Sequence, residues 1–198
     1  LDENTRREIK SLIMREVVPA IGCTEPVAVA LAVAKASETL GTAPARIEVA
    51  LSGNILKNAM GVGIPGTGMI GLPIAIALGA ITGKSEYGLE VLRDVDDNAV
   101  DLGKKMISEE RVEISHYPEA PDKLYISAIA RDESGGHFGK AVICGGHTRF
   151  VHIEKDSEVL FHEDFAGECD GADEEIALTL HTVWRYAVES PLDELIFI

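Results

Sequence analysis

The sequence has few cysteines and no apolar run long enough to span a membrane. It has three cysteines (Cys23, Cys144 and Cys169), and no two form a Cys-x-x-Cys pair. A disulfide framework or a zinc ribbon is therefore not expected. The apolar run 69–81 is shorter than the roughly 20 residues that a membrane-spanning helix needs. The acidic beginning of the chain does not resemble a signal peptide, so we expect a cytoplasmic protein.

Basic and aromatic residues are also scarce. The chain has 18 lysines and arginines against 33 aspartates and glutamates, which gives a formal net charge of −15. A surface this acidic repels phosphate backbones and anionic lipids, so neither nucleic acid nor a membrane is expected as a partner. Aromatic residues make up only 5% of a chain that is 46% apolar. This composition predicts a globular protein with an aliphatic, alanine-rich core.

Hydrophobic periodicity predicts a helical, glycine-rich first half. Thr5 and Glu8 fit a capping box at the start of the first helix. Helical spacing of apolar residues then predicts helices at about 5–18, 26–40, 70–82 and 95–108, and an alternating segment predicts one strand at 46–51.

The apolar period changes to two after residue 110. Strands are expected at about 112–114, 124–130, 140–143 and 150–153, followed by a helix at about 173–188. Short turns between successive strands favour an antiparallel meander. We therefore predict an α+β fold, with a helical glycine-rich region (1–110) followed by a mainly antiparallel sheet and a C-terminal helix (111–198). The chain lacks an initiator methionine and ends on apolar residues, so we expect it to be a fragment of a longer enzyme.

Cys23 is the residue best placed for chemistry. It follows Gly22 and precedes Pro26, at the predicted start of an apolar helix. The free N–H groups and dipole of a helix N-terminus lower the pKa of a thiol. Cys23 is thus a candidate nucleophile or metal ligand. Glu25 could act as a general base or simply stabilise the helix N-terminus.

A second candidate site is the glycine-rich stretch from Gly61 to Gly68. Its backbone N–H groups could bind an anion, or the glycines could serve only a tight turn. A G-x-G-x-x-G match begins at Gly61, but the predicted strand ends about ten residues earlier, and a dinucleotide-binding turn needs the loop directly between strand and helix.

Polar side chains just before this loop could bind a small acid or amine. Lys57 could alternatively carry pyridoxal phosphate as a Schiff base, or be a solvated helix lysine. Cys144 lies in an apolar strand and is expected to be a buried core residue. Cys169 lies in an acidic loop, which raises the pKa of a thiol, so it is expected to be unreactive. A zinc site from His147 and His152 is a further alternative.

Two segments together resemble the L-cysteine desulfidase family, which is related to the alpha chain of iron–sulfur L-serine dehydratases. They are Cys-Thr-Glu-Pro at 23–26 and Gly-Asn-Ile-Leu-Lys-Asn-Ala-Met-Gly-Val-Gly-Ile-Pro-Gly-Thr-Gly at 53–68, and the resemblance covers roughly residues 5–82. It implies an oxygen-sensitive enzyme with a 4Fe–4S cluster and one open iron. The implied reaction converts L-cysteine to pyruvate, ammonia and sulfide, or L-serine to pyruvate and ammonia.

The resemblance also implies roles for individual residues. Cys23 would be a cluster ligand, with the other ligand cysteines in a C-terminal half outside this chain. Glu25 is our candidate catalytic group, and the expected substrate-binding residues are Thr24, Asn54, Lys57, Asn58, Gly66 and Thr67. Because helices 27–40 and 70–82 are apolar all round, we expect a homo-oligomer or packing against the missing half. A pyridoxal-phosphate lyase using Lys57 and a non-catalytic domain for acid binding or assembly are the alternatives.

Overall fold

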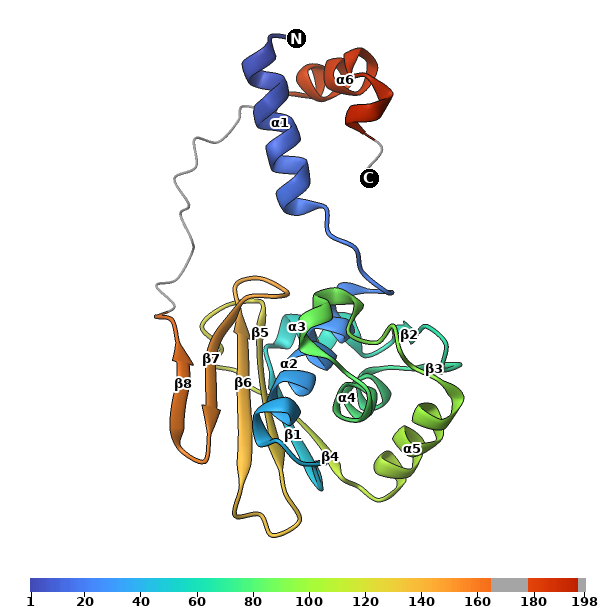
Figure 1. The fold of residues 1–198 in the computed structure, drawn as a ribbon, viewed down its shortest axis with the longest axis vertical. Helices are drawn as coiled ribbons and strands as arrows, with labels where there is room; N and C mark the ends of the chain where they lie inside the picture. Colours follow the sequence, from blue (N-terminus) through green and yellow to red (C-terminus); the bar gives the residue numbers. More distant parts are fainter. Residues whose placement is uncertain (165–177, 196–198) are drawn as a thin grey trace. The chain divides into compact units, whose positions relative to one another are not determined.

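The computed structural model describes residues 1–164 and 178–195, which fall into two compact units. The smaller unit combines residues 1–19 with the described residues 178–195, and contains α1 (Glu3–Glu16), α6 (Leu180–Glu189) and η2 (Leu192–Glu194). The larger unit begins at Ala20 and holds all the other described elements (Figure 1). The change of period near residue 110 lies inside the larger unit.

The larger unit is built on a six-stranded sheet in the order β4-β1-β5-β6-β7-β8. The strands are β1 (Arg46–Leu51), β4 (Val112–His116), β5 (Tyr125–Arg131), β6 (Phe138–Cys144), β7 (Phe150–Lys155) and β8 (Glu158–His162). The β1–β4 pairing is parallel, and the other four pairings of this sheet are antiparallel. The α+β class is thereby confirmed.

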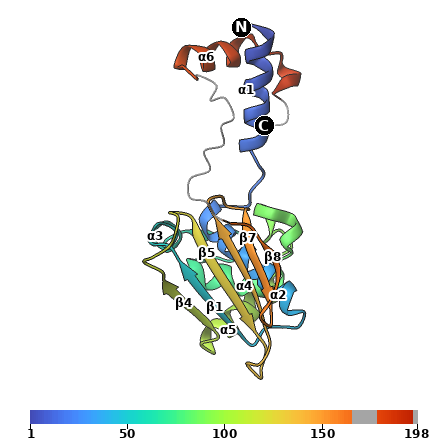
Figure 2. The same cartoon turned by 90° about the vertical axis from the view of Figure 1, so that its left-hand side faces the viewer.

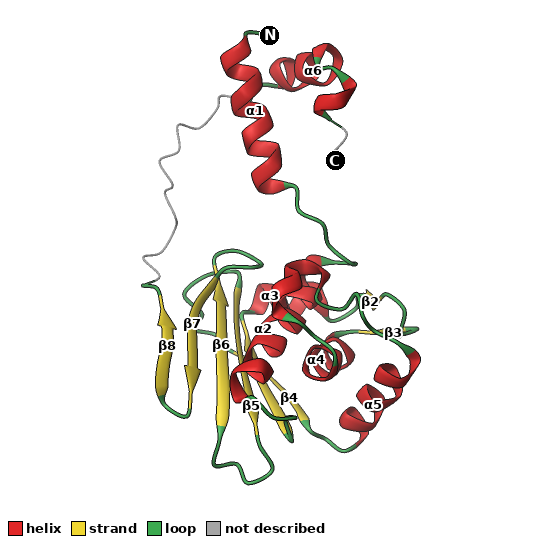
Figure 3. Ribbon diagram, viewed as in Figure 1, coloured by secondary structure: helices red, strands yellow, loops and turns green. Residues whose placement is uncertain are grey.

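Helix α2 (Thr24–Leu40) packs on β5 and β6 and is buried over most of its length. Alanines and glycines allow this close packing, since a Cβ added at Gly139 of β6 would stand 2.2 Å from the carbonyl oxygen of Ala36. Helices α4 (Leu72–Ile81) and α5 (Asp97–Ser108) follow on the same side of the sheet (Figure 3). In Figure 2 the opposite face of the sheet turns toward the viewer, with these helices behind it.

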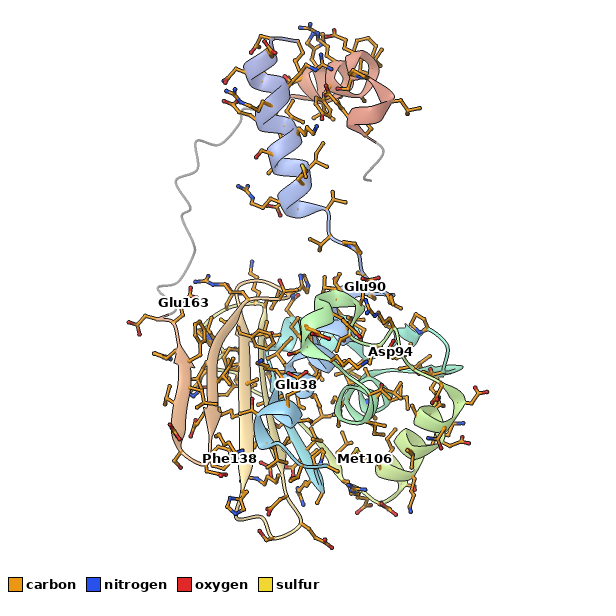
Figure 4. The ribbon with its side chains drawn as sticks, viewed as in Figure 1. Glu38, Glu90, Asp94, Met106, Phe138 and Glu163 are labelled. Carbon is orange, nitrogen blue, oxygen red and sulfur yellow. The ribbon has the colours of Figure 1, made fainter. Side chains whose placement is uncertain are left out.

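The helix ends follow local chemistry. Gly41 ends α2 in a left-handed conformation (φ +83°), which glycine adopts without a steric penalty. The Glu38 carboxylate near that end accepts hydrogen bonds from the backbone and the hydroxyl of Ser85, at the start of η1 (Ser85–Glu90). Figure 4 marks Glu38 on α2, and Met106 on the buried side of α5.

Several predicted boundaries need correction. The first helix is capped by Asp2, whose carboxylate accepts the Thr5 N–H, so the predicted capping box at Thr5 is wrong. The last helix begins at Leu180, and residues 173–177 of its predicted range lie outside the described residues. The sequence patterns also missed α3 (Gly53–Ala59), the hairpin of β2 (Gly63–Ile64) and β3 (Met69–Ile70), and strand β8.

None of the helices in the described residues is long and apolar enough to cross a membrane.

Candidate functional site

Cys23 is the N-cap residue of α2, with its side chain exposed. The segment before it is anchored, because the Ile21 N–H donates to the carbonyl of Leu89 at 3.1 Å. Gly22 turns the chain into the helix with φ +88°, a left-handed conformation that favours glycine. The thiol therefore stands at a defined place beside the unpaired N–H groups of the first helical turn.

Glu25 connects the cysteine to α3. The Cys23 thiol donates to Glu25 Oε2 at an Sγ–Oε2 distance of 2.9 Å, and the amide of Asn58 donates to Glu25 Oε1 at 3.3 Å. The Thr24 hydroxyl lies 3.4 Å from the same Oε2 atom. The two sequence segments that carry the family resemblance thus meet at one carboxylate.

The electrostatics of this group differ from the sequence prediction. The Glu25 carboxylate accepts the thiol hydrogen bond and repels a developing thiolate, so the pKa of Cys23 is raised rather than lowered. The pKa of Glu25 is lowered, first by the Cys23 hydrogen bond and then by Asn58 and the nearby His147. The helix N-terminus is present as predicted, but a carboxylate two residues away outweighs it.

His147 is a member of this group that the sequence analysis did not place near Cys23. It lies half-buried in the β6–β7 turn, close enough to Glu25 to lower the pKa of that carboxyl. The ring nitrogens of His152 contact His162 and Glu154, so the histidine partner that the structure gives His152 is His162 rather than the His147 of the zinc alternative. The glycines at 145 and 146, directly before His147, were the one available signal of a tight turn presenting it.

The glycine-rich stretch forms a tight hairpin rather than a strand–loop–helix turn. The Thr67 hydroxyl donates to the Ile64 carbonyl at 2.7 Å and accepts the Met69 N–H at 2.9 Å. Gly66 and Gly68 both have positive φ, at +77° and +63°. The dinucleotide-binding alternative is therefore wrong. The Thr67 hydroxyl both donates and accepts a hydrogen bond within the hairpin.

The polar residues before the hairpin separate into two groups. Asn58 is half-buried and contacts Glu25, whereas Asn54 and Lys57 are exposed and make no hydrogen bond or ion pair within the described residues. Cys144 is 1% exposed, and burial raises its pKa to about 11, so its predicted role as a core residue is confirmed. Cys169 lies outside the described residues.

The site offers one ligand to an iron–sulfur cluster. A 4Fe–4S cluster is held mainly by cysteine thiolates, and Cys23 is the exposed cysteine of the two in the described chain. Residues 1–164 and 178–195 contain no group of three or more His, Cys, Asp or Glu side chains placed to hold a metal ion. Cys23 thus fits the role of a single ligand, and a complete cluster needs thiolates from elsewhere.

Comparison with known proteins gives relatives but no activity. No family model matches the chain, and no solved structure matches it. It is 55% identical over 198 residues to a UPF0597 protein of Bacteroides fragilis strain ATCC 25285, matching 100% of this chain and 46% of the relative. It is 55% identical over 196 residues to a UPF0597 protein of Bacteroides thetaiotaomicron, matching 99% of this chain and 45% of that relative.

A more distant match is a UPF0597 protein of Aeromonas hydrophila, 43% identical over 191 residues, which are 95% of this chain and 43% of the relative. The chain therefore spans about half the length of the curated relatives it matches. The names of these relatives state no reaction or ligand. The chain is similar to one half of the UPF0597 proteins.

Proposed function

We propose that this chain is the N-terminal part of a cytoplasmic iron–sulfur lyase that eliminates the β-substituent of an L-amino acid, either L-cysteine or L-serine. The observation that carries the proposal is the hydrogen-bonded group Cys23–Glu25–Asn58. It joins the exposed cysteine at the start of α2 to the residue stretch before the glycine hairpin. Both segments belong to the resemblance, and they were brought together by folding rather than by sequence.

Cys23 would supply one thiolate to a 4Fe–4S cluster. In the metal-free chain the neighbouring Glu25 carboxylate raises the pKa of the Cys23 thiol. A cation bound to the sulfur stabilises the thiolate and offsets this effect. The free N–H groups of α2 then add to the stabilisation of the bound thiolate. A bound cluster supplies a Lewis-acidic iron for the leaving β-substituent.

Glu25 is our candidate for proton transfer. Once the thiol proton is gone, Glu25 Oε2 loses its strongest hydrogen bond, while Asn58 still orients Oε1. Loss of the Cys23 hydrogen bond removes the main cause of the lowered Glu25 pKa, while Asn58 and His147 still favour the ionised carboxylate that a general base requires. Glu25 could then accept the Cα proton of the substrate.

The substrate's own carboxylate would be bound by donors at the same end of the fold. The exposed Asn54 and Lys57 are free for this role, and Thr24 and Gly66 are further candidates from the same two sequence segments. The matched relatives are about twice as long as this chain. We propose that the remaining cluster ligands, and the surface that closes the site, come from that other half or from a second copy.

The alternatives find less support. A lysine that forms a Schiff base is activated by desolvation in an apolar pocket or by a neighbouring cation, whereas the Lys57 side chain is exposed on α3. A non-catalytic acid-binding domain would use the N–H groups of the hairpin, but those of Thr67 and Met69 already donate to hairpin acceptors.

The test uses a full-length protein that carries this chain, purified without oxygen. The iron and sulfide content of the protein is measured for wild type, Cys23→Ser and the control Cys144→Ala. The release of pyruvate from L-cysteine and from L-serine is measured for the same three proteins. We expect Cys23→Ser to lose both iron and activity and Cys144→Ala to keep them. A Cys23→Ser protein with full iron and activity would contradict the proposal, and an aldimine absorbance lost in Lys57→Ala would favour the pyridoxal-phosphate alternative.

A further inference from the structure

Two histidines face each other on the last two strands of the sheet, outside the Cys23 site. His152 of β7 and His162 of β8 are direct cross-strand partners. Their Nδ1 atoms are 3.3 Å apart, and the rings meet edge to face at 79° with centroids separated by 5.4 Å. On the β6 side of its strand, His152 is paired with Val142, whose side chain lies outside the core cluster formed with α2. Because paired residues share a face of the sheet, the two imidazoles lie on the face opposite α2.

The other nitrogen of each ring contacts a carboxylate. His152 Nε2 lies 3.0 Å from Glu154 Oε2, and His162 Nε2 lies 3.2 Å from Asp164 Oδ1. A carboxylate only accepts hydrogen bonds, so both Nε2 atoms carry hydrogen. In neutral imidazoles the two Nδ1 atoms, 3.3 Å apart, are then both acceptors, and their lone pairs repel each other. Such a pair lacks a donor or a cation between its members.

The spacing matches what a metal ion requires. A nitrogen–zinc distance of about 2.0–2.1 Å in tetrahedral geometry separates two ligand nitrogens by about 3.4 Å. A carboxylate that accepts from the far nitrogen is the usual outer partner of a metal-bound histidine, because it fixes the tautomer and the ring orientation. Here both histidines have that partner.

We propose that His152 and His162 form a binding site for one divalent transition-metal ion of the zinc class, held by their two Nδ1 atoms. Glu154 and Asp164 act as positioning residues behind the rings. Within the described residues no third histidine, cysteine or carboxylate completes a cage, so the remaining coordination positions are open to water or to a ligand atom from outside.

The site is accessible from solvent. The His152 side chain is 20% exposed and that of His162 is 57% exposed, and β8 is the edge strand of the sheet. Figure 4 labels Glu163, the residue directly after His162 at the end of β8. The Glu163 N–H donates to the Val151 carbonyl at 2.9 Å, which holds the end of β8 against β7. The two ligands therefore sit on paired backbone rather than on free loops.

The test is zinc binding by the 198-residue chain, made metal-free and carrying Cys23→Ser and Cys169→Ser so that these two thiols do not compete. Calorimetry should show about one zinc ion per chain. In His162→Gln the affinity should fall at least tenfold, whereas Glu154→Gln should weaken it by roughly 10- to 100-fold through the outer partner. The matched control is His137→Gln, which removes an exposed histidine directly before β6 and should leave binding unchanged.

Cobalt absorption provides a second readout, because nitrogen and oxygen ligands give a spectrum without a thiolate charge-transfer band. Circular dichroism checks that each variant is folded. The proposal is overturned if the parent chain binds no zinc, which would mean that a shared proton alone bridges the two rings. It is equally overturned if His162→Gln binds zinc as tightly as the parent chain.

Discussion

Gly22 lies directly against the ring of Pro65, so that a Cβ on Gly22 would stand 3.0 Å from both Cγ and Cδ of the proline. This contact joins the residue before Cys23 to the tip of the glycine hairpin. Gly22 also has a left-handed backbone, with φ +88°. Glycine is therefore required there for two reasons, a conformation and a close approach.

Replacing Gly22 with alanine should destabilise the larger unit. The left-handed backbone alone costs an L-residue roughly 1–2 kcal/mol, and the contact with Pro65 adds to that cost. The matched control is Gly66→Ala, which has φ +77° but no atom within 4 Å of the position that a Cβ would take. Chemical denaturation should show a larger loss for Gly22→Ala, and adding Pro65→Ala should recover part of the difference. Equal losses for the two single variants would show that the Pro65 contact is not limiting.

The thiols should differ sharply in reactivity. Cys144 is 1% exposed with a pKa raised to about 11, so it should resist alkylation at about pH 8 until the protein unfolds. Cys23 is exposed and should react in the folded, metal-free chain. Because the Glu25 carboxylate raises the pKa of Cys23, Glu25→Gln should make its alkylation several-fold faster. Peptide mass spectrometry reads each site separately, and Glu38→Gln is the control. An unchanged rate in Glu25→Gln would show that the carboxylate does not govern the thiol.

The His137–Asp156 pair predicts a dependence of stability on pH. The hydrogen bond from His137 Nδ1 to Asp156 Oδ2, 3.0 Å long, raises the pKa of the histidine above its usual 6.5. The folded state thus holds the proton more tightly than the unfolded state. This contribution is present in full below pH 6.5 and is lost as the pH rises through the folded-state pKa.

His137→Gln should consequently destabilise the protein more at about pH 5.5 than at about pH 8.5. Urea denaturation at the two pH values measures the difference. His116→Gln is the control, because His116, at the end of β4, is also exposed and forms no ion pair within the described residues. A destabilisation by His137→Gln that is the same at both pH values would exclude this linkage.

Two helical glycines should respond differently to alanine. A Cβ on Gly79 of α4 would stand 2.5 Å from the backbone oxygen of Ala30, whereas on Gly103 of α5 it would meet the tip of Ile74 at 3.0 Å. Both substitutions gain about 1 kcal/mol of helix propensity. The α2 backbone cannot move aside easily, so Gly79→Ala should cost about 1–3 kcal/mol net of that gain. Gly103→Ala should be close to neutral, since a side-chain tip can rotate. Thermal denaturation of both variants distinguishes a rigid helix contact from a soft one.

The parts of the fold that follow from local patterns were predictable. The apolar run of α2, with Pro26 in its first turn and Gly41 after its end, placed that helix within two residues of its bounds. The alternation in β5, β6 and β7 placed three strands of the meander. Burial of Cys144 followed from its apolar strand. In each case the residues that decide the structure are neighbours in the sequence.

The remaining features depend on residues distant in sequence. The parallel pairing of β1 with β4 gave no local signal, and β8 is exposed along its whole length, so no apolar alternation marked it. At the site, the sequence indicates the helix N-terminus beside Cys23, but the orientation of the Glu25 carboxylate toward the thiol exists only in the folded chain. His147 reaches Glu25 across more than one hundred residues of sequence, beyond the reach of any spacing rule.

The position of β1 also sets an order of events during folding. This strand lies between β4 and β5, and both neighbours follow it by more than sixty residues in the chain. Closing loops of that length costs entropy before any strand pairing repays it. The β5–β8 meander, by contrast, needs only short turns. During synthesis, α2 and β1 leave the ribosome first but lack their sheet partners until β5 has followed. The apolar face of α2 that is buried in the folded protein therefore stays exposed until β5 has been synthesised. In this interval the chain depends most on protection from aggregation.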